Sequence, residues 1–77
     1  MLLTVEIKDV GKPGSAEAAM CFDEEGLDAL IKTLTKLRGK QDHVHLMTPS
    51  WAGKELTEIK QGGVEYELVN HLRLVKR

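Results

Sequence analysis

The sequence predicts an α+β domain in which a single mostly antiparallel sheet carries one helix packed on one face. Three observations lead to this prediction. Several short stretches alternate apolar and polar residues, a pattern typical of strands with one buried face. The stretch from Asp23 to Arg38 instead repeats its apolar residues at helical spacing. The chain has 77 residues, enough for one core layer, so residues 1–77 are expected to form a single domain in the order β-β-α-β-β-β.

Two strands are expected before the helix. Residues 3–8 alternate strictly, with apolar residues at the odd positions. Residues 9–17 contain Gly, Pro and Ser, which favour turns. Ala18 to Phe22 is short and apolar and follows a loop of hairpin length, so it is interpreted as a second antiparallel strand. Cys21, the only cysteine, has no partner for an internal disulfide and is expected to pack as a small apolar side chain.

The helix is expected from about Asp23 to Arg38. The Asp23 carboxylate can accept hydrogen bonds from the free amides of the first turn, and Gly39 can adopt the left-handed conformation that ends a helix. Gly26 disfavours the helix by about 1 kcal/mol relative to Ala, and indicates either the close approach of a strand or a helix that starts later. One apolar stripe is formed by Leu27, Leu30, Ile31, Leu34 and Leu37.

Three more strands are expected after the helix. In His43 to Met47, Val44 and Leu46 belong to the core side, and the two histidines and Met47 belong to the other. Residues 54–61 are interpreted as a short strand. Beyond Gly62 and Gly63, residues 64–74 alternate as one long half-buried strand that bulges, bends or breaks at Asn70.

Between these strands, Pro49 lacks a backbone donor and is expected to end the pairing. Residues 50–53 should then form a turn that carries Trp51. Because the chain has only one Phe, one Trp and one Tyr, the indole is expected to fold over the edge of the core, with an exposed contact role as the alternative.

Within one sheet, the side chains that point away from the helix form an open polar surface. That surface is expected to carry Thr4, Glu6, Lys8, His43, His45, Met47, Glu65, Glu67, His71 and Arg73. With the adjacent turn, it predicts a partner-binding site made of His43, His45, Met47, Trp51, Glu65, Glu67, His71 and Arg73.

The three histidines of this surface suggest two kinds of chemistry. Three convergent imidazoles can bind zinc, and His45 with His71 can act as general acid and base on a phosphodiester. A solvated sheet face is the preferred interpretation, because a His-x-His pair arises readily by chance and Glu65 and Glu67 would repel phosphates. No catalytic residue, metal ligand or cofactor is therefore assigned.

Charge and hydrophobicity limit the classes of partner and the compartment that can be expected. Eleven Lys and Arg against twelve Asp and Glu give a net charge of −1, which provides no field to attract nucleic-acid phosphates. No segment reaches the roughly 20 apolar residues of a membrane span, and the N-terminus lacks the features of a secretion signal. A cytoplasmic protein is expected. Its small size favours surface recognition over an enclosed active site and leaves open a homodimer that supplies missing burial.

The chain also resembles the immunity protein 32 family of bacterial polymorphic toxin systems. The segments that carry the resemblance are Leu30-Ile31 through Leu37, His43-Val44-His45-Leu46-Met47-Thr48, Trp51-Ala52-Gly53-Lys54-Glu55-Leu56 and His71-Leu72-Arg73-Leu74. It extends over residues 1–77, and its most specific part is the His-Val-His-Leu-Met-Thr run followed by Trp-x-Gly-x-Glu-Leu. The resemblance implies a protein that neutralises a cognate toxin by binding it, without catalytic residues.

The sequence therefore predicts a non-enzymatic, antitoxin-like binding protein. Two alternatives stay open. One is a small metal-binding or phosphodiester-acting enzyme centred on His43, His45 and His71, and the other is a structural homodimer.

Overall fold

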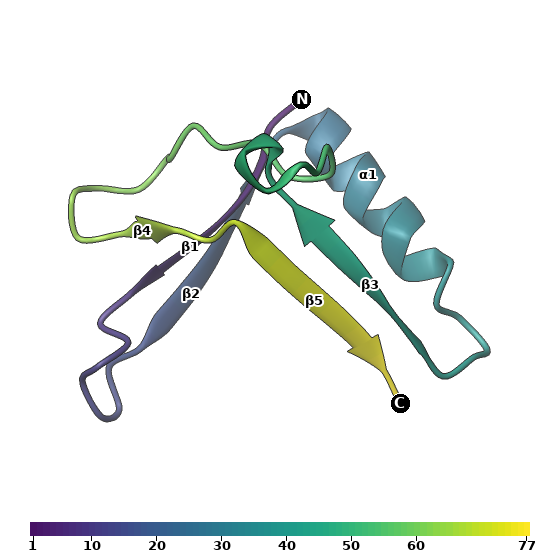
Figure 1. Cartoon of the computed structure of the whole chain (residues 1–77), viewed down its shortest axis with the longest axis horizontal. Coiled ribbons are helices and arrows are strands. Elements are labelled where there is room, and N and C mark those ends of the chain that lie inside the picture. The colour runs from purple at the N-terminus through teal and green to yellow at the C-terminus, as the bar shows by residue number, and fades with distance from the viewer.

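Five strands, one α-helix and one short 3-10 turn make up the computed structural model, which describes residues 1–77. The elements are β1 (Leu3–Lys8), β2 (Glu17–Phe22), α1 (Glu24–Thr35), β3 (Asp42–Met47), η1 (Pro49–Trp51), β4 (Glu67–Leu68) and β5 (His71–Lys76). The α+β class is confirmed, and every strand pair is antiparallel. The strands divide between two sheets, one with the order β2-β1-β4 and one formed by β3 and β5. Figure 1 shows these sheets diverging from a common end.

The central strand β1 is buried on both faces at its start. Leu3 and Val5 are buried on the core side, as the alternation predicts. Thr4 and Glu6, expected on an open polar face, are buried as well. That expectation was wrong because the irregular segment before β4 covers this face and donates backbone N–H groups to Glu6.

The core lies where the two sheets meet. Its four buried members are Leu3, Val5, Leu46 and Leu56, and Val44, Val69, Leu72 and Leu74 pack against them. In the second sheet, Leu46 pairs with Leu72 and Val44 with Leu74, so these four side chains share the core face. The chain passes from one sheet to the other between β4 and β5, at Asn70, where a break into two strands was one of the predicted outcomes.

Residues 54–61, predicted as a strand, form none. Thr57 bonds to Leu3 through one backbone and one side-chain hydrogen bond, and Leu56 enters the core. Val64, predicted as an apolar strand position, is 99% exposed in a turn. These residues remain irregular because their hydrogen bonds go to side chains and single backbone groups of β1 and β3 and not to a continuous strand ladder.

Helix α1 begins as predicted and ends earlier. Asp23 caps it, its Oδ1 accepting from the Gly26 N–H at 2.8 Å. After Thr35 the chain tightens into turns with i to i+3 hydrogen bonds, and Gly39 takes a left-handed φ of 78°. The predicted end at Arg38 therefore includes this tight turn. No helix in the structure combines the length and apolar character that crossing a bilayer requires.

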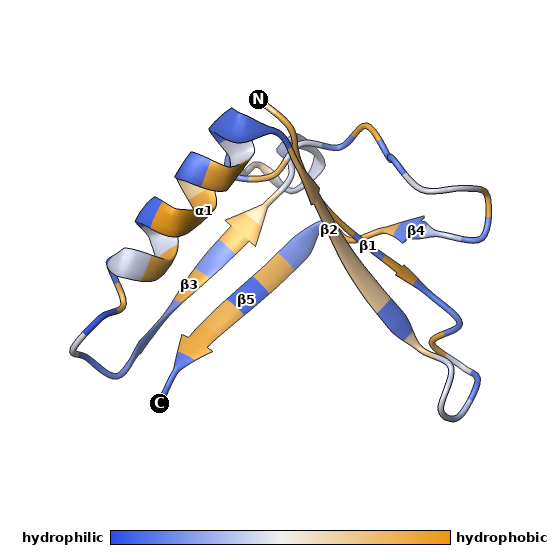
Figure 2. Ribbon diagram, turned by 180° about the vertical axis from the view of Figure 1, so that it is seen from behind, coloured by the Kyte–Doolittle hydropathy of each residue, from blue (hydrophilic) through white to orange (hydrophobic).

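The apolar stripe of α1 is only half covered. Leu37 is buried, but Ile31 is 53% and Leu34 49% exposed, which contradicts the predicted buried stripe. The cause is Gly26, which packs so closely on the Leu2 carbonyl that a Cβ there would lie 1.8 Å from the oxygen. Gly26 lies about 100° around the helix from the following leucine, so this contact turns part of the stripe outwards. Figure 2 shows the apolar residues gathered on one side of α1.

Candidate functional site

The three histidines lie side by side on the outward face of the β3–β5 sheet. The register pairs His45 with Arg73 and Met47 with His71, and His43 lies on the same face two residues before His45. His45 Nδ1 and His71 Nε2 are 2.7 Å apart, so one nitrogen donates a proton and the other accepts it. The His43 ring stands edge-on to the His45 ring, with 5.0 Å between centroids. The expected placement of all three side chains on one face is thus present.

Trp51 joins this row from the corner after β3. Two hydrogen bonds hold this corner against the residue before β5. The Thr48 hydroxyl donates to Asn70 Oδ1 at 2.7 Å, and the Thr48 N–H donates to the Asn70 carbonyl at 3.0 Å. Pro49 opens the 3-10 turn with its φ already fixed. The indole lies 6.0 Å from the His71 ring, centroid to centroid, and is 56% exposed. The expectation that it folds over the core was therefore wrong.

The residues after Trp51 hold the corner in place. Gly53 has no room for a side chain, because a Cβ would lie 2.4 Å from the Met47 carbonyl oxygen. Glu55 accepts a hydrogen bond from the Met47 N–H at 3.0 Å, and the Leu56 N–H donates to the Met47 carbonyl at 3.1 Å. The Trp-x-Gly-x-Glu-Leu run is therefore a hydrogen-bonded corner that leaves the indole exposed.

Six of the eight predicted site residues come together. We call this set the His–Trp surface: His43, His45, Met47, Trp51, His71 and Arg73. Glu65 and Glu67 do not join it. Glu67 lies in β4 and pairs with Ile7 in the other sheet, and Glu65 lies in the turn before β4. The alternation of side chains along the strands placed all eight residues on one face only if the strands formed one continuous sheet. The corner at Asn70 instead divides the strands between two sheets.

Charge on the His–Trp surface depends on pH. The pKa of His45 is lowered, first by burial of its ring and then by the positive charges of His71, His43 and Arg73. His45 is therefore mainly neutral at pH 7, which suits the shared hydrogen bond with His71. Arg73 supplies the one fixed positive charge of this surface.

Comparisons with known proteins add no relatives to these observations. No family model, curated protein or solved structure matches the chain. The function is therefore argued from the geometry of the chain itself.

The chemistry open to this surface follows from its distances. Two imidazole nitrogens that bind the same tetrahedral zinc lie about 3.3 Å apart, whereas the 2.7 Å between His45 and His71 fits a direct hydrogen bond. No group of three His, Cys, Asp or Glu side chains is placed to hold a metal ion. The molecule has two hollows, of which one includes His43 and Arg73, and neither includes His45, His71 or Trp51. What the His–Trp surface offers is open contact area with imidazole, indole and guanidinium groups.

Glu6 is a second polar centre, one that sequence reasoning missed. It is 1% exposed and accepts hydrogen bonds from the Thr4 hydroxyl at 2.6 Å, the Gln61 N–H at 3.0 Å and the Gly62 N–H at 2.7 Å. Burial raises its pKa, but these bonds and one from Cys21 together hold the pKa below its ordinary value. An acidic residue at an alternating strand position gives no signal of this role, because its partners lie far along the chain. Glu6 ties the irregular segment before β4 to the central strand.

Proposed function

We propose that this chain is a non-enzymatic protein-binding module that acts as an antitoxin-like immunity protein through the His–Trp surface. The observation that carries the proposal is the exposed Trp51 side chain, held on a hydrogen-bonded corner beside a row of three imidazoles. A partly exposed tryptophan on a fixed backbone is the kind of residue that dominates protein interfaces. Little ordering of the corner is needed on binding, which preserves affinity.

The composition of the surface indicates the chemistry of its partner. Arg73 and the imidazole N–H groups are donors, and the two carboxylates that were expected beside them lie elsewhere. Trp51 and Met47 add apolar area. We therefore expect a toxin surface that presents carboxylates around an apolar depression into which the indole fits.

The test is binding to the product of the adjacent gene, measured by calorimetry together with neutralisation of its toxicity. Trp51→Ala should weaken binding by about 2 kcal/mol, roughly 30-fold in Kd, because the indole is the anchor of the contact. His45→Ala should also weaken it, since the variant removes the partner that orients His71.

Ile59→Ala is the matched control, because Ile59 is 78% exposed and lies outside the His–Trp surface. It should bind as the unmodified chain does. A neighbouring product that is not a toxin or does not bind would contradict the immunity role, and full neutralisation by Trp51→Ala would show that the assigned surface is wrong.

A further inference from the structure

The chain exposes more surface than its size accounts for. Its solvent-accessible surface is 5406 Å², whereas a folded monomer of 8.6 kDa exposes about 4,700 Å². Its radius of gyration is 13.2 Å, against about 11.5 Å for a compact domain of this length. The excess of about 700 Å² is close to the roughly 800 Å² that each partner contributes to a stable interface.

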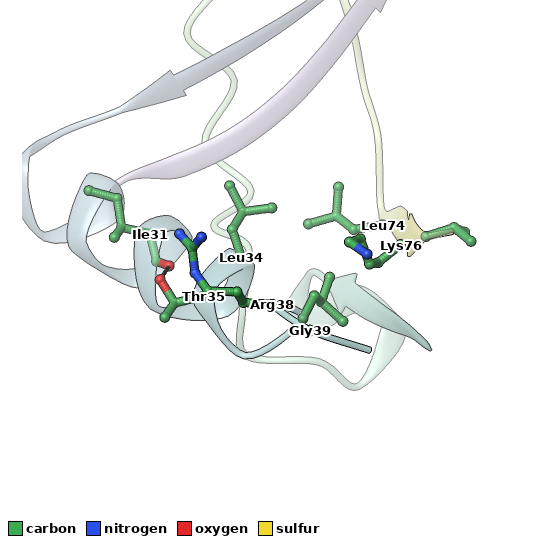
Figure 3. A pocket seen from close by; sticks show the side chains of 9 residues that line it. Ile31, Leu34, Thr35, Arg38, Gly39, Leu74 and Lys76 are labelled. Carbon is green, nitrogen blue, oxygen red and sulfur yellow. Dashed lines mark hydrogen bonds between the residues drawn. The ribbon is translucent and has the colours of Figure 1, made fainter. Parts of the chain in front are cut away.

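Part of this excess lies in an open groove between α1 and β5, with a volume of about 540 Å³. Figure 3 shows its lining, with Ile31 and Leu34 on the helix, Arg38 just past its end, and Leu74 across from them. Five of its nine lining residues are hydrophobic, and Ile31 and Leu34 are the two helix positions that the core leaves uncovered. An apolar centre of this kind is typical of an interface between identical subunits.

The charges along the exposed side of α1 favour a second copy as the occupant. Glu24 is the first residue of α1, and Arg38 lies in the turn just after its end, where it lines the groove together with Ile31. Neither Glu24 nor Arg38 forms an ion pair within the chain. When two such helices pair antiparallel about a two-fold axis at Ile31, each Glu24 faces the Arg38 of the other copy. The same surface is then self-complementary, as a two-fold interface requires.

We propose that two copies of this chain form a dimer in which α1 packs antiparallel against α1 and covers the groove beside β5. Ile31 and Leu34 form the centre of this interface, and Glu24 and Arg38 form its two ends. None of the groove residues belongs to the His–Trp surface, so the dimer goes beyond the proposed binding function and leaves that surface free.

Sedimentation equilibrium of the full chain tests this interface. The unmodified chain should have a mass of twice 8.6 kDa, and Ile31→Glu should reduce it to the monomer. Because Ile31 is more than half exposed, this variant should keep its helical circular dichroism. Val64→Glu places the same charge at a fully exposed turn position and should remain a dimer.

A charge exchange tests the antiparallel arrangement. Glu24→Arg and Arg38→Glu should each weaken dimerisation about 5-fold, because each brings two like charges together at both ends of the interface. The double variant should restore the affinity. A chain that stays monomeric at high concentration overturns the dimer, as does a dimer that Ile31→Glu leaves intact. If the chain stays monomeric and binds a different protein through Ile31, the proposal that a second copy covers the groove is wrong. Trp51→Ala should leave the dimer unchanged, so the two proposals fail separately.

Discussion

Glu6 shows how one side chain can replace a stretch of regular structure. The segment between η1 and β4 has no strand ladder of its own, and the Glu6 carboxylate accepts the N–H groups of both Gln61 and Gly62. A buried carboxylate is tolerated only when hydrogen bonds compensate for its lost hydration, and here the Thr4 hydroxyl adds a third. Together with the two hydrogen bonds between Thr57 and Leu3, this group holds the segment against β1.

We predict that Glu6 makes the stability of the fold sensitive to acid. Its folded pKa lies below the ordinary 4.5, so the fold favours the charged form. This contribution is present above pH 4.5 and is lost as the pH falls through the lower folded pKa. Glu6→Gln sets an NH₂ group against N–H donors and should lower the free energy of unfolding at pH 7 by about 2 kcal/mol. Urea unfolding at pH 7 and below pH 4 measures both effects.

Glu67→Gln is the control for this prediction, because Glu67 is exposed and makes no hydrogen bond through its side chain. It should change stability little and keep the acid sensitivity. Equal effects of the two substitutions would show that Glu6 does not hold the segment.

At the scale of elements, the periodicity of the sequence correctly predicted those features that depend on contacts between residues close in the sequence. The strand at residues 3–8, the Asp23 cap and the common face of His43 and His45 were confirmed, because each depends on neighbours in the sequence. The rotation of α1 was not predictable from its stripe, since it follows from Gly26 meeting Leu2.

The remaining differences also arise from contacts between distant residues. Residues 54–61 were predicted as a strand from their own composition, whereas their conformation follows from bonds to Leu3 and Glu6. The exposure of Trp51 depends on the tie between Thr48 and Asn70, which fixes the direction of the corner. The sequence pattern thus placed six of the eight predicted residues on one surface, but it did not reveal the division of the sheet that separates Glu65 and Glu67 from them.

Gly26 in α1 allows two opposing effects to be compared. Helix propensity alone predicts that Gly26→Ala stabilises the fold by about 1 kcal/mol. The added Cβ would instead lie 1.8 Å from the Leu2 carbonyl oxygen, which accepts the Asp23 N–H, and 3.0 Å from the Phe22 Cβ. Backbone atoms must then move, so we expect a net loss of about 1–3 kcal/mol. Thermal or urea unfolding measures the sign.

Gly11→Ala is the matched control for this substitution, because nothing lies within 4 Å of the position and its φ is not positive. Its effect should stay within about 0.5 kcal/mol. A Gly26→Ala variant that is more stable than the unmodified chain would mean that the helix can move away from Leu2 without loss.

For the whole molecule, the two sheets meet at one end and enclose a core cluster of four buried apolar residues. A 77-residue chain has little burial to spare, and here the uncovered side of α1 adds surface that water must solvate. Dimerisation through that side would place Ile31 and Leu34 in an apolar environment. Folding and association would then be linked, as in other small subunits that are stabilised by their partner copy.

This linkage predicts that unfolding depends on protein concentration. If each dimer unfolds to two separate chains, a tenfold increase in concentration should raise the apparent free energy of unfolding by about 1.4 kcal/mol per dimer, which shifts the urea midpoint upwards. Ile31→Glu should have a lower midpoint that no longer changes with concentration, because its monomer unfolds alone. Val64→Glu should keep the dependence of the unmodified chain. A midpoint that is constant over a hundredfold range in the unmodified chain would mean that the exposed side of α1 is tolerated by a stable monomer.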